Sequence, residues 1–290
     1  MQHSRTAVLT DLDGTLFNSQ GLVSNEDRAA IAEYIAQGGL FGVATGREPG
    51  NARVHLPELP MNAPSIVLNG AAVYDFERKR YLNYVLLDQE AALQVIRHCK
   101  SLALPLDIQV YTTEGIFYAT PLETADPGFL RIHQPTSYLE LTELQEKAWM
   151  KVVLLEREKD ALREMVSFLK ESGLERQISI VEGTTDVVKI GKYQELLPAG
   201  INKGSGVELV RSLPDYTGRT IFAVGDYWND MELLQAADVA CAPSNAIDEV
   251  KAISQAILPS HNESAIAWLI REVIPHMGGL PCGAAGNRVL

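Results

Sequence analysis

The chain has little positive charge and no long apolar run. Its 290 residues carry 25 Lys and Arg against 37 Asp and Glu, for a formal net charge of −12. Because nucleic-acid-binding surfaces need clustered basic residues, we expect no nucleic-acid partner. No apolar stretch reaches the ~18 residues of a membrane-spanning helix, so we expect no membrane partner either. If the ligand is a phosphate, local cationic groups and a metal must overcome the acidic background.

Cysteine is scarce as well. The chain has three, Cys99, Cys241 and Cys282, and their wide spacing fits neither a disulfide framework nor a metal-binding pair. We expect Cys99 and Cys241 in the core, and Cys282 as an exposed thiol in a Gly-rich tail. No secretory signal pattern precedes the first predicted strand, so we expect a cytoplasmic protein. Nothing in the sequence indicates an oligomeric state.

Both ends of the chain show strands that alternate with helices. We expect strands at residues 6–10, 40–44, 65–68, 220–224 and 238–242, and helices that include 203–213 and 228–236. Ser24 is a typical N-cap for a further helix, which Gly38 and Gly39 would end. This alternation predicts an α/β fold, a Rossmann-like parallel sheet with right-handed crossovers.

The middle of the chain has a different pattern. The charged turn at residues 77–80 suggests a hairpin, and short strands and two helices follow it in α+β order. We therefore predict two domains, a catalytic core of residues 1–82 and 192–290 and an inserted α+β domain of residues 83–191.

The most informative stretch is Thr10-Asp11-Leu12-Asp13-Gly14-Thr15-Leu16, directly after an apolar run. Residues i and i+2 of an extended segment share one face, so Asp11 and Asp13 should lie close together at the carboxyl end of a strand. Two close carboxylates favour a divalent cation or a raised pKa on one of them. The simpler interpretation of the same residues is a polar turn.

Three further clusters follow predicted strands or begin predicted helices. They are Thr45-Gly46-Arg47, then Lys203 at a helix start, and finally Asp226, Asn229 and Asp230. Pro49 favours a helix beginning just after Arg47, whose backbone N–H groups could meet an anion. Taken singly, Thr45 is commonly a turn hydroxyl and Lys203 a solvated charge. Together they combine an anionic nucleophile, oxygen ligands for a hard cation, a hydroxyl and an ammonium, which suits phosphoryl transfer.

These motifs resemble those of the haloacid dehalogenase superfamily of phosphotransferases. The resemblance rests on DLDGTL, the Thr of ATGR, the Lys of NKG, and GDYWND. A closer resemblance, to the Cof-type phosphatases, rests on the NGA that begins at Asn69, the LPAGINKG that ends at Gly204, and the APSNA that contains Asn245. The long segment between Thr45 and Lys203 resembles the larger α+β cap of that family, which would carry substrate specificity.

The resemblance implies a Mg²⁺-dependent phosphatase that acts on a small phosphorylated metabolite, such as a sugar phosphate, through an aspartyl-phosphate. It also implies a role for each motif residue. Asp11 would be the nucleophile, Asp13 the general acid and base, and Thr45 and Lys203 the groups that hold the phosphoryl oxygens. Gly46, Arg47 and Asn229 would help bind substrate. Asp11, Asp226 and the backbone carbonyl of Asp13 would bind Mg²⁺, and Asp230 would orient Lys203.

Two other functions remain open at this level. A phosphosugar mutase on the same scaffold would need the inserted domain to retain a bisphosphate intermediate. A non-catalytic phospho-Asp signalling module also pairs a strand-end Asp with Mg²⁺ and a Lys. Asp13, a built-in acid and base, and the large insertion argue against the signalling module. No motif in the insertion identifies the substrate.

Overall fold

The structure, a computed structural model, describes residues 3–127, 137–184 and 191–277. It divides into two compact units, Met1–Asn83 with Asn202–Leu290, and Tyr84–Ile201. The first is here called the core unit and the second the inserted unit. The first division differs by one residue from the boundary at 82 that we derived from the sequence. The second lies ten residues beyond 192, because a strand in between pairs within the inserted unit.

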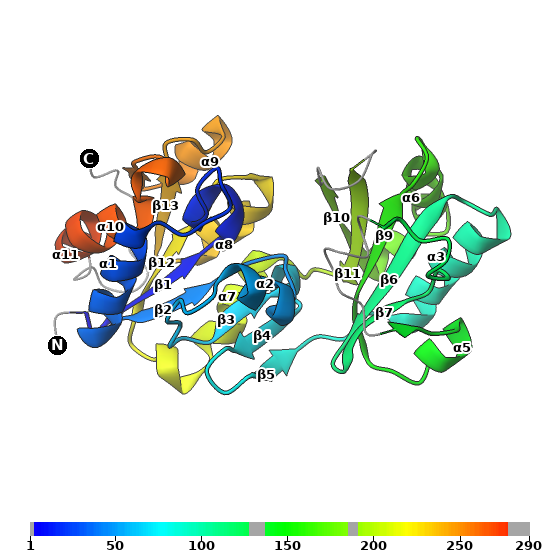
Figure 1. The fold of residues 1–290 in the computed structure, drawn as a ribbon, viewed down its shortest axis with the longest axis horizontal. Coiled ribbons are helices and arrows are strands. Elements are labelled where there is room, and N and C mark those ends of the chain that lie inside the picture. Colours follow the sequence, from blue (N-terminus) through cyan, green and yellow to red (C-terminus); the bar gives the residue numbers. More distant parts are fainter. Residues whose placement is uncertain (1–2, 128–136, 185–190, 278–290) are drawn as a thin grey trace. The chain divides into compact units, whose positions relative to one another are not determined.

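The core unit is built on a parallel sheet of five strands, in the order β14-β13-β12-β1-β2 (Figure 1). Its strands are β1 (Thr6–Thr10), β2 (Leu40–Val43), β12 (Thr220–Val224), β13 (Val239–Pro243) and β14 (Ala256–Leu258). All four pairings are parallel. A parallel bridge from Ala44 to Ile66 joins this sheet to a smaller one, β3-β4-β5. The smaller sheet comprises β3 (Ser65–Val67), β4 (Ala72–Asp75) and β5 (Arg80–Tyr84), and it contains the predicted hairpin.

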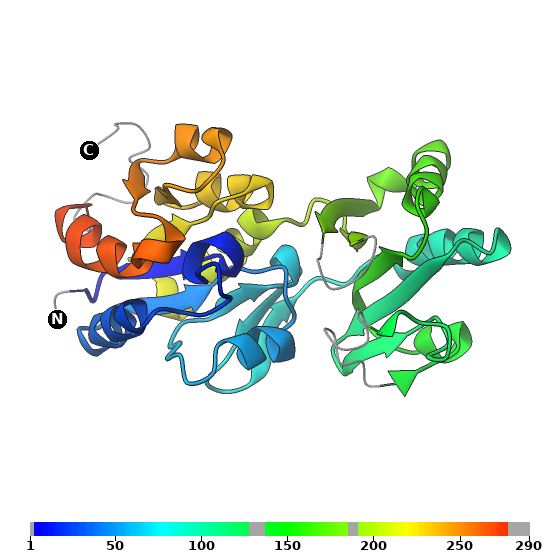
Figure 2. The ribbon, with the colours of Figure 1, turned by 45° about the horizontal axis from the view of Figure 1, so that its top comes forward.

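Helices cover both faces of the parallel sheet (Figure 2). They are α1 (Asn25–Ala36), α2 (Pro49–His55), α7 (Lys203–Arg211), α8 (Met231–Ala236), α9 (Asp248–Ile253), α10 (Ala265–Trp268) and α11 (Ile274–Met277). Apolar residues of α7, α8 and α9 pack with Leu9, Ile221 and Ala240 in one cluster. Helices α1 and α10 lie side by side. Because strands covered on both faces must be apolar on both, β1 and β12 are buried throughout.

The inserted unit contains a sheet of six strands, in the order β10-β11-β9-β6-β7-β8. Its strands are β6 (Leu106–Thr112), β7 (Gly115–Tyr118), β8 (Ser137–Tyr138), β9 (Trp149–Glu156), β10 (Ile178–Thr184) and β11 (Lys192–Pro198). Its helices are α3 (Gln89–Ser101), α5 (Leu141–Leu144) and α6 (Ala161–Glu171). Every strand pairing is antiparallel except that of β7 with β8. Apolar residues of α3 and α6 form one cluster with this sheet, so the α+β prediction is confirmed.

Strand β11 explains the displaced boundary. It was not among the strands predicted from the sequence, and it lies on the core side of the predicted boundary at 192. In the structure it pairs with β10, from Ile178↔Pro198 to Thr184↔Lys192, and with β9. These long-range pairings fix its place in the inserted unit.

The described residues include two of the three cysteines and all the helices considered for membrane spans. Cys99 and Cys241 are free and buried, as predicted. Cys282 lies outside the described residues. Among the helices that the structure describes, none combines the length and the apolar character that crossing a membrane requires.

Candidate active site

Three neighbouring strands of the core sheet end at the same edge, and their loops carry the motif residues. Strand β1 lies between β12 and β2. At its end the N–H of Asp11 donates to the carbonyl of Val224 (2.8 Å), and the N–H of Ala44 donates to the carbonyl of Thr10 (2.8 Å). The segments that begin at Asp11, Thr45 and Asp226 therefore leave the sheet side by side, where open α/β sheets bind ligands.

Lys203 lies at the centre of the site. Its ammonium donates to Asp11 Oδ1 (2.7 Å) and to Asp230 Oδ1 (2.6 Å), and all three residues are buried. The Asn202 side chain accepts from the N–H of Ser205 and caps α7, which holds Lys203 in the first helical position. The second oxygen of Asp230 accepts from the N–H groups of Asp226 (3.0 Å) and Tyr227 (3.3 Å). Asp230 thus ties Lys203 to the turn after β12.

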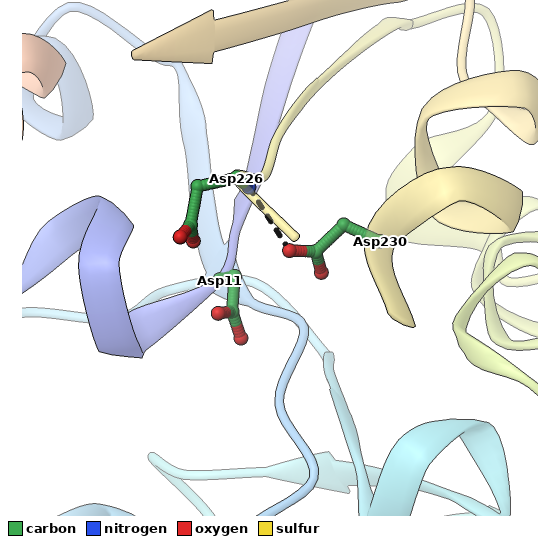
Figure 3. A group of neighbouring side chains, drawn as sticks. All are labelled: Asp11, Asp226 and Asp230. Atoms are coloured by element: carbon green, nitrogen blue, oxygen red, sulfur yellow. Dashed lines mark hydrogen bonds between the residues drawn. The ribbon is translucent and has the colours of Figure 1, made fainter. Parts of the chain in front are cut away.

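The carboxylate of Asp11, after β1, and those of Asp226 and Asp230, after β12, gather around one space (Figure 3). One oxygen of each lies within 4.8 Å of the others, so the group could hold a metal ion. Thr15 Oγ1 donates to Asp226 Oδ1 (2.7 Å) and fixes that carboxylate. Gly14 has φ +75°, and a side chain there would overlap Asp226 Oδ2. The glycine therefore allows the first loop to approach Asp226 closely.

Burial dominates the electrostatics of this group. It raises the pKa of Asp226 to about 6, partly opposed by the hydrogen bond from Thr15. Burial also raises the pKa of Asp11, which Lys203 opposes and Asp230 and Asp13 reinforce. The pKa of Lys203 is raised because the attraction of Asp11 and Asp230 exceeds the effect of burial, so the ammonium keeps its charge. The site holds more carboxylates than cations, so negative charge is in excess, and a divalent cation would offset it. The carboxylates are those of Asp11, Asp13, Asp226 and Asp230, and the cations are Lys203 and Arg47.

Asp13 lies in a different environment from Asp11. Its carboxylate is 64% exposed and accepts two hydrogen bonds from Arg47, from Nε (3.0 Å) and Nη2 (2.8 Å). Arg47 is held in turn by Asn51 Oδ1 (2.8 Å) and lies 5.7 Å from the centre of the Phe17 ring. The structure therefore pairs Arg47 with Asp13, which the sequence did not predict.

A strained turn supports the loop of Thr45 and Gly46. Leu68, Asn69 and Gly70 have φ of +54°, +53° and +97°. The N–H of Asn69 donates to the carbonyl of Thr45 (3.1 Å), and Gly70 approaches the Asn202 carbonyl so closely that a side chain would overlap it. This turn, residues 68–70, joins the loop after β2 to the start of α7. Thr45 is buried, and its hydroxyl accepts from the N–H of Arg47 (3.2 Å).

The structure contradicts one expectation at this edge and leaves another untested. The N–H groups at the start of α2 are not open to an anion, because the Glu48 side chain accepts from Gly50 (2.7 Å) and from Asn51. Asn229 is half-buried, and its side chain makes no hydrogen bond to any described residue. Its role in binding substrate stays a prediction.

Sequence reasoning missed two residues that position the first loop. One is Thr15, through its bond to Asp226. The other is Asn245, whose Nδ2 donates to the carbonyl of Gly14 (2.8 Å) and whose Oδ1 accepts from the N–H of His261 (2.9 Å). Both stand in motifs that the sequence analysis singled out, but only the fold brings them to their distant partners.

The chain is similar to known proteins in both sequence and fold. A sequence model of the haloacid dehalogenase-like hydrolases matches residues 8–270. The 5-amino-6-(5-phospho-D-ribitylamino)uracil phosphatase YwtE of Bacillus subtilis is 24% identical, over 92% of this chain and 97% of its own. The pyridoxal phosphate phosphatase YbhA of Escherichia coli is 26% identical, over 91% and 96%.

A solved structure gives the same result for the fold. TM0651 from Thermotoga maritima superposes with a TM-score of 0.74 at 22% identity, over 91% of this chain and 96% of its own. The family match spans both parts of the core unit and the whole insertion between them. The chain therefore belongs to the haloacid dehalogenase-like hydrolases, of the Cof type, and is an enzyme of that family.

Proposed function

We propose that the chain is a Mg²⁺-dependent phosphatase of small phosphorylated metabolites that works through an aspartyl-phosphate on Asp11. The observation that carries the proposal is the buried Lys203 ammonium, bound to Asp11 and Asp230 beside the carboxylate of Asp226. This arrangement combines a nucleophile, a fixed cation for phosphoryl oxygens and an excess of negative charge. Phosphoryl transfer depends mainly on such positioning and charge neutralisation.

The donor set suits magnesium. Asp11 and Asp226 would hold the ion with the backbone carbonyl of Asp13, and all of these ligands are oxygens, as Mg²⁺ prefers. Asp230 belongs to the same group of carboxylates, but its two oxygens already bind Lys203 and two backbone N–H groups. We therefore assign Asp230 to positioning. When bound, the ion would offset the repulsion between these carboxylates and the phosphate dianion.

Asp11 would attack the phosphorus, forming a bond from its carboxylate oxygen as the bond to the leaving oxygen breaks. Lys203 would stabilise the negative charge of the transferring group, together with the Thr45 hydroxyl. Asp13 would give a proton to the leaving oxygen and then accept one from the water that hydrolyses the aspartyl-phosphate. A carboxylate that accepts two bonds from Arg47 cannot donate, so the acid step requires this pair to separate.

The relatives support the proposed substrate class. Their names give a phosphorylated ribitylaminouracil and pyridoxal phosphate as substrates. The motif residues Asp11, Asp13, Thr45, Lys203 and Asp226 would contact phosphate, metal and water, and none of these five would contact the rest of a substrate. We assign that task chiefly to the inserted unit, Tyr84–Ile201.

Two measurements test the proposal. Release of phosphate from acetyl phosphate should collapse in excess chelator and return with Mg²⁺. Acid quenching during turnover should then trap a phosphorylated peptide that contains Asp11. Undiminished release in chelator would contradict the metal assignment, and a phosphate adduct on another residue would contradict the nucleophile. With a hexose phosphate, free phosphate rather than an isomeric hexose phosphate should appear, which separates a phosphatase from a mutase.

A further inference from the structure

Two large aromatic side chains stand exposed directly beside the candidate metal site. Tyr227 is 56% exposed and Trp228 is 53% exposed, and they fill the two positions after Asp226. Neither side chain makes a ring contact or a hydrogen bond with any residue that the structure describes. Large apolar groups left in water at a functional site mark a surface that something else covers.

These side chains stand on a fixed backbone. The N–H of Tyr227 donates to Asp230 Oδ2 (3.3 Å), and the carbonyl of Tyr227 accepts from the N–H of Asp230 (3.0 Å). Trp228 begins the 3₁₀ turn Trp228–Asp230. Asp230 is fully buried and bonded to Lys203, so the same carboxylate that orients the ammonium also holds the backbone of Tyr227, at the start of this turn. The position of the turn is set before any ligand arrives, which lowers the entropy cost of binding.

Chain geometry keeps this surface close to the phosphate. Consecutive Cα atoms are about 3.8 Å apart, so the Trp228 Cα lies within about 8 Å of those of Asp226 and Asp230. With a phosphoryl group bound by Asp11 and Lys203, the rest of the substrate is the leaving group, and the turn that carries the two aromatic residues lies next to that phosphate site.

We propose that Tyr227 and Trp228 form an aromatic surface that recognises the leaving group, and that the preferred substrates are phosphomonoesters carrying a planar heteroaromatic ring. The inference rests on the proposed phosphatase function. Aromatic rings stack on one another with little dependence on their substituents, which suits recognition of a flat ring in a strongly acidic site. In this role Trp228 is a specificity residue and takes no part in the bond-breaking steps.

The test compares two classes of substrate in matched variants. Uridine 5′-monophosphate and pyridoxine 5′-phosphate carry rings, whereas glycerol 3-phosphate and acetyl phosphate do not. Trp228→Ala should lower kcat/KM about tenfold for the ring-bearing pair, as expected for the loss of one stacking contact, and change it less than twofold for the others. Tyr227→Ala combined with Trp228→Ala should lose more, and Trp228→Phe should keep most of the preference.

Trp268→Ala is the control, because Trp268 is also exposed (48%) but lies on α10. It should leave both substrate classes unchanged. An equal loss for both classes in Trp228→Ala would overturn the proposal, since the rings would then serve something other than the leaving group. So would an unchanged preference for ring-bearing substrates. Failure of the phosphatase function itself is distinguishable, because the wild-type protein would then release no phosphate from acetyl phosphate with Mg²⁺.

Discussion

Each unit of the molecule contains a buried lysine paired with a carboxylate, and the two pairs differ in their surroundings. In the core unit, Lys203 lies 2.7 Å from Asp11 and 2.6 Å from Asp230. In the inserted unit, Lys151 on β9 lies 2.8 Å from Glu195 on β11 and 4.7 Å from the Tyr111 ring centre. Both lysine side chains are nearly inaccessible, at 1% and 3% exposure.

The difference lies in charge balance and in the type of sheet. Lys151 forms its ion pair with Glu195 within antiparallel strands, beside the ring of Tyr111. Lys203 stands at the edge of a parallel sheet among several carboxylates, so negative charge is left over to attract a cation. Burial of an ion pair is thus a weak indicator of function, whereas an unbalanced buried cluster at a strand-end edge is a strong one.

The largest effect is expected at Asp11. Asp11→Asn keeps the shape but removes the nucleophile, so phosphate release should fall by about 10³-fold or more with every substrate. Asp13→Asn should lose far more activity with an alkyl phosphate than with acetyl phosphate, since a good leaving group needs little acid. Steady-state phosphate assays on both variants check this. Near-normal turnover in Asp11→Asn would mean that the two roles are reversed.

The next prediction distinguishes Lys203, whose loss should lower kcat, from Lys151, whose loss should lower stability. Lys203→Ala should lower kcat by roughly 10²–10³-fold, the usual cost of one lost donor in a preorganised site. Lys151→Met should instead lower the free energy of unfolding by about 3–5 kcal/mol, because Glu195 loses its ion-pair partner in the interior. The kcat of the folded Lys151→Met protein should change less than about threefold. Denaturant titrations beside the kinetics measure both quantities, and a change below threefold for Lys203→Ala would make it a structural charge.

A moderate effect is expected from pH through Asp226. Its pKa in the folded protein, about 6, exceeds the ordinary value of 3.8, so the folded state holds this proton more tightly. Its contribution to metal-free stability is therefore present at low pH and lost as pH rises from about 4 to 6. Since Mg²⁺ must displace the proton, its apparent affinity should rise up to about tenfold per pH unit below 6. Calorimetric titration with Mg²⁺ at several pH values measures the slope, and Asp226→Asn should reduce it.

The smallest effect tests whether the core unit and the inserted unit unfold independently of each other. Ser24 caps α1 in the core unit through Asp27 N (2.9 Å), and Asp88 caps α3 in the inserted unit through Ala91 N (3.0 Å). Replacing either by Ala should cost about 1 kcal/mol. Hydrogen exchange should show faster opening only in the unit that carries the change. A uniform acceleration across both units would mean that the chain unfolds as one cooperative body.

Local sequence patterns predicted much of the fold. The apolar run before Asp11, the Ser24 cap and the alternation of strands and helices are local signals, and β1, α1 and β12 follow them closely. Strand β11 was missed because its edges are defined by partners at Ile178–Thr184 and on β9 rather than by its own pattern. The predicted boundary at 192 was displaced for the same reason.

For the candidate site, too, local motifs predicted the residue types, whereas the contacts between distant residues could not be predicted. The sequence motifs predicted Asp11 and Asp226, at strand ends, and Lys203, at the start of a helix, because phosphoryl transfer requires those residue types. Their partners could not be read from spacing, since Thr15 bonds Asp226 across 211 residues and Asn245 bonds Gly14 across 231. The pairing of Arg47 with Asp13 and the use of Glu48 as a cap depend on side-chain conformations, which no one-dimensional pattern records.

The close approaches at Gly14 and Gly70 bear on how this enzyme can evolve. At both positions a single added methyl group would overlap a neighbouring oxygen, of Asp226 in one case and of Asn202 in the other. Both backbones also have positive φ, so a side chain would meet steric and conformational penalties together. A side chain at either position should therefore displace the loop that carries it. The exposed side chains of Tyr227 and Trp228 are under no such steric constraint, so substitutions are expected to be tolerated there far better than at the two glycines.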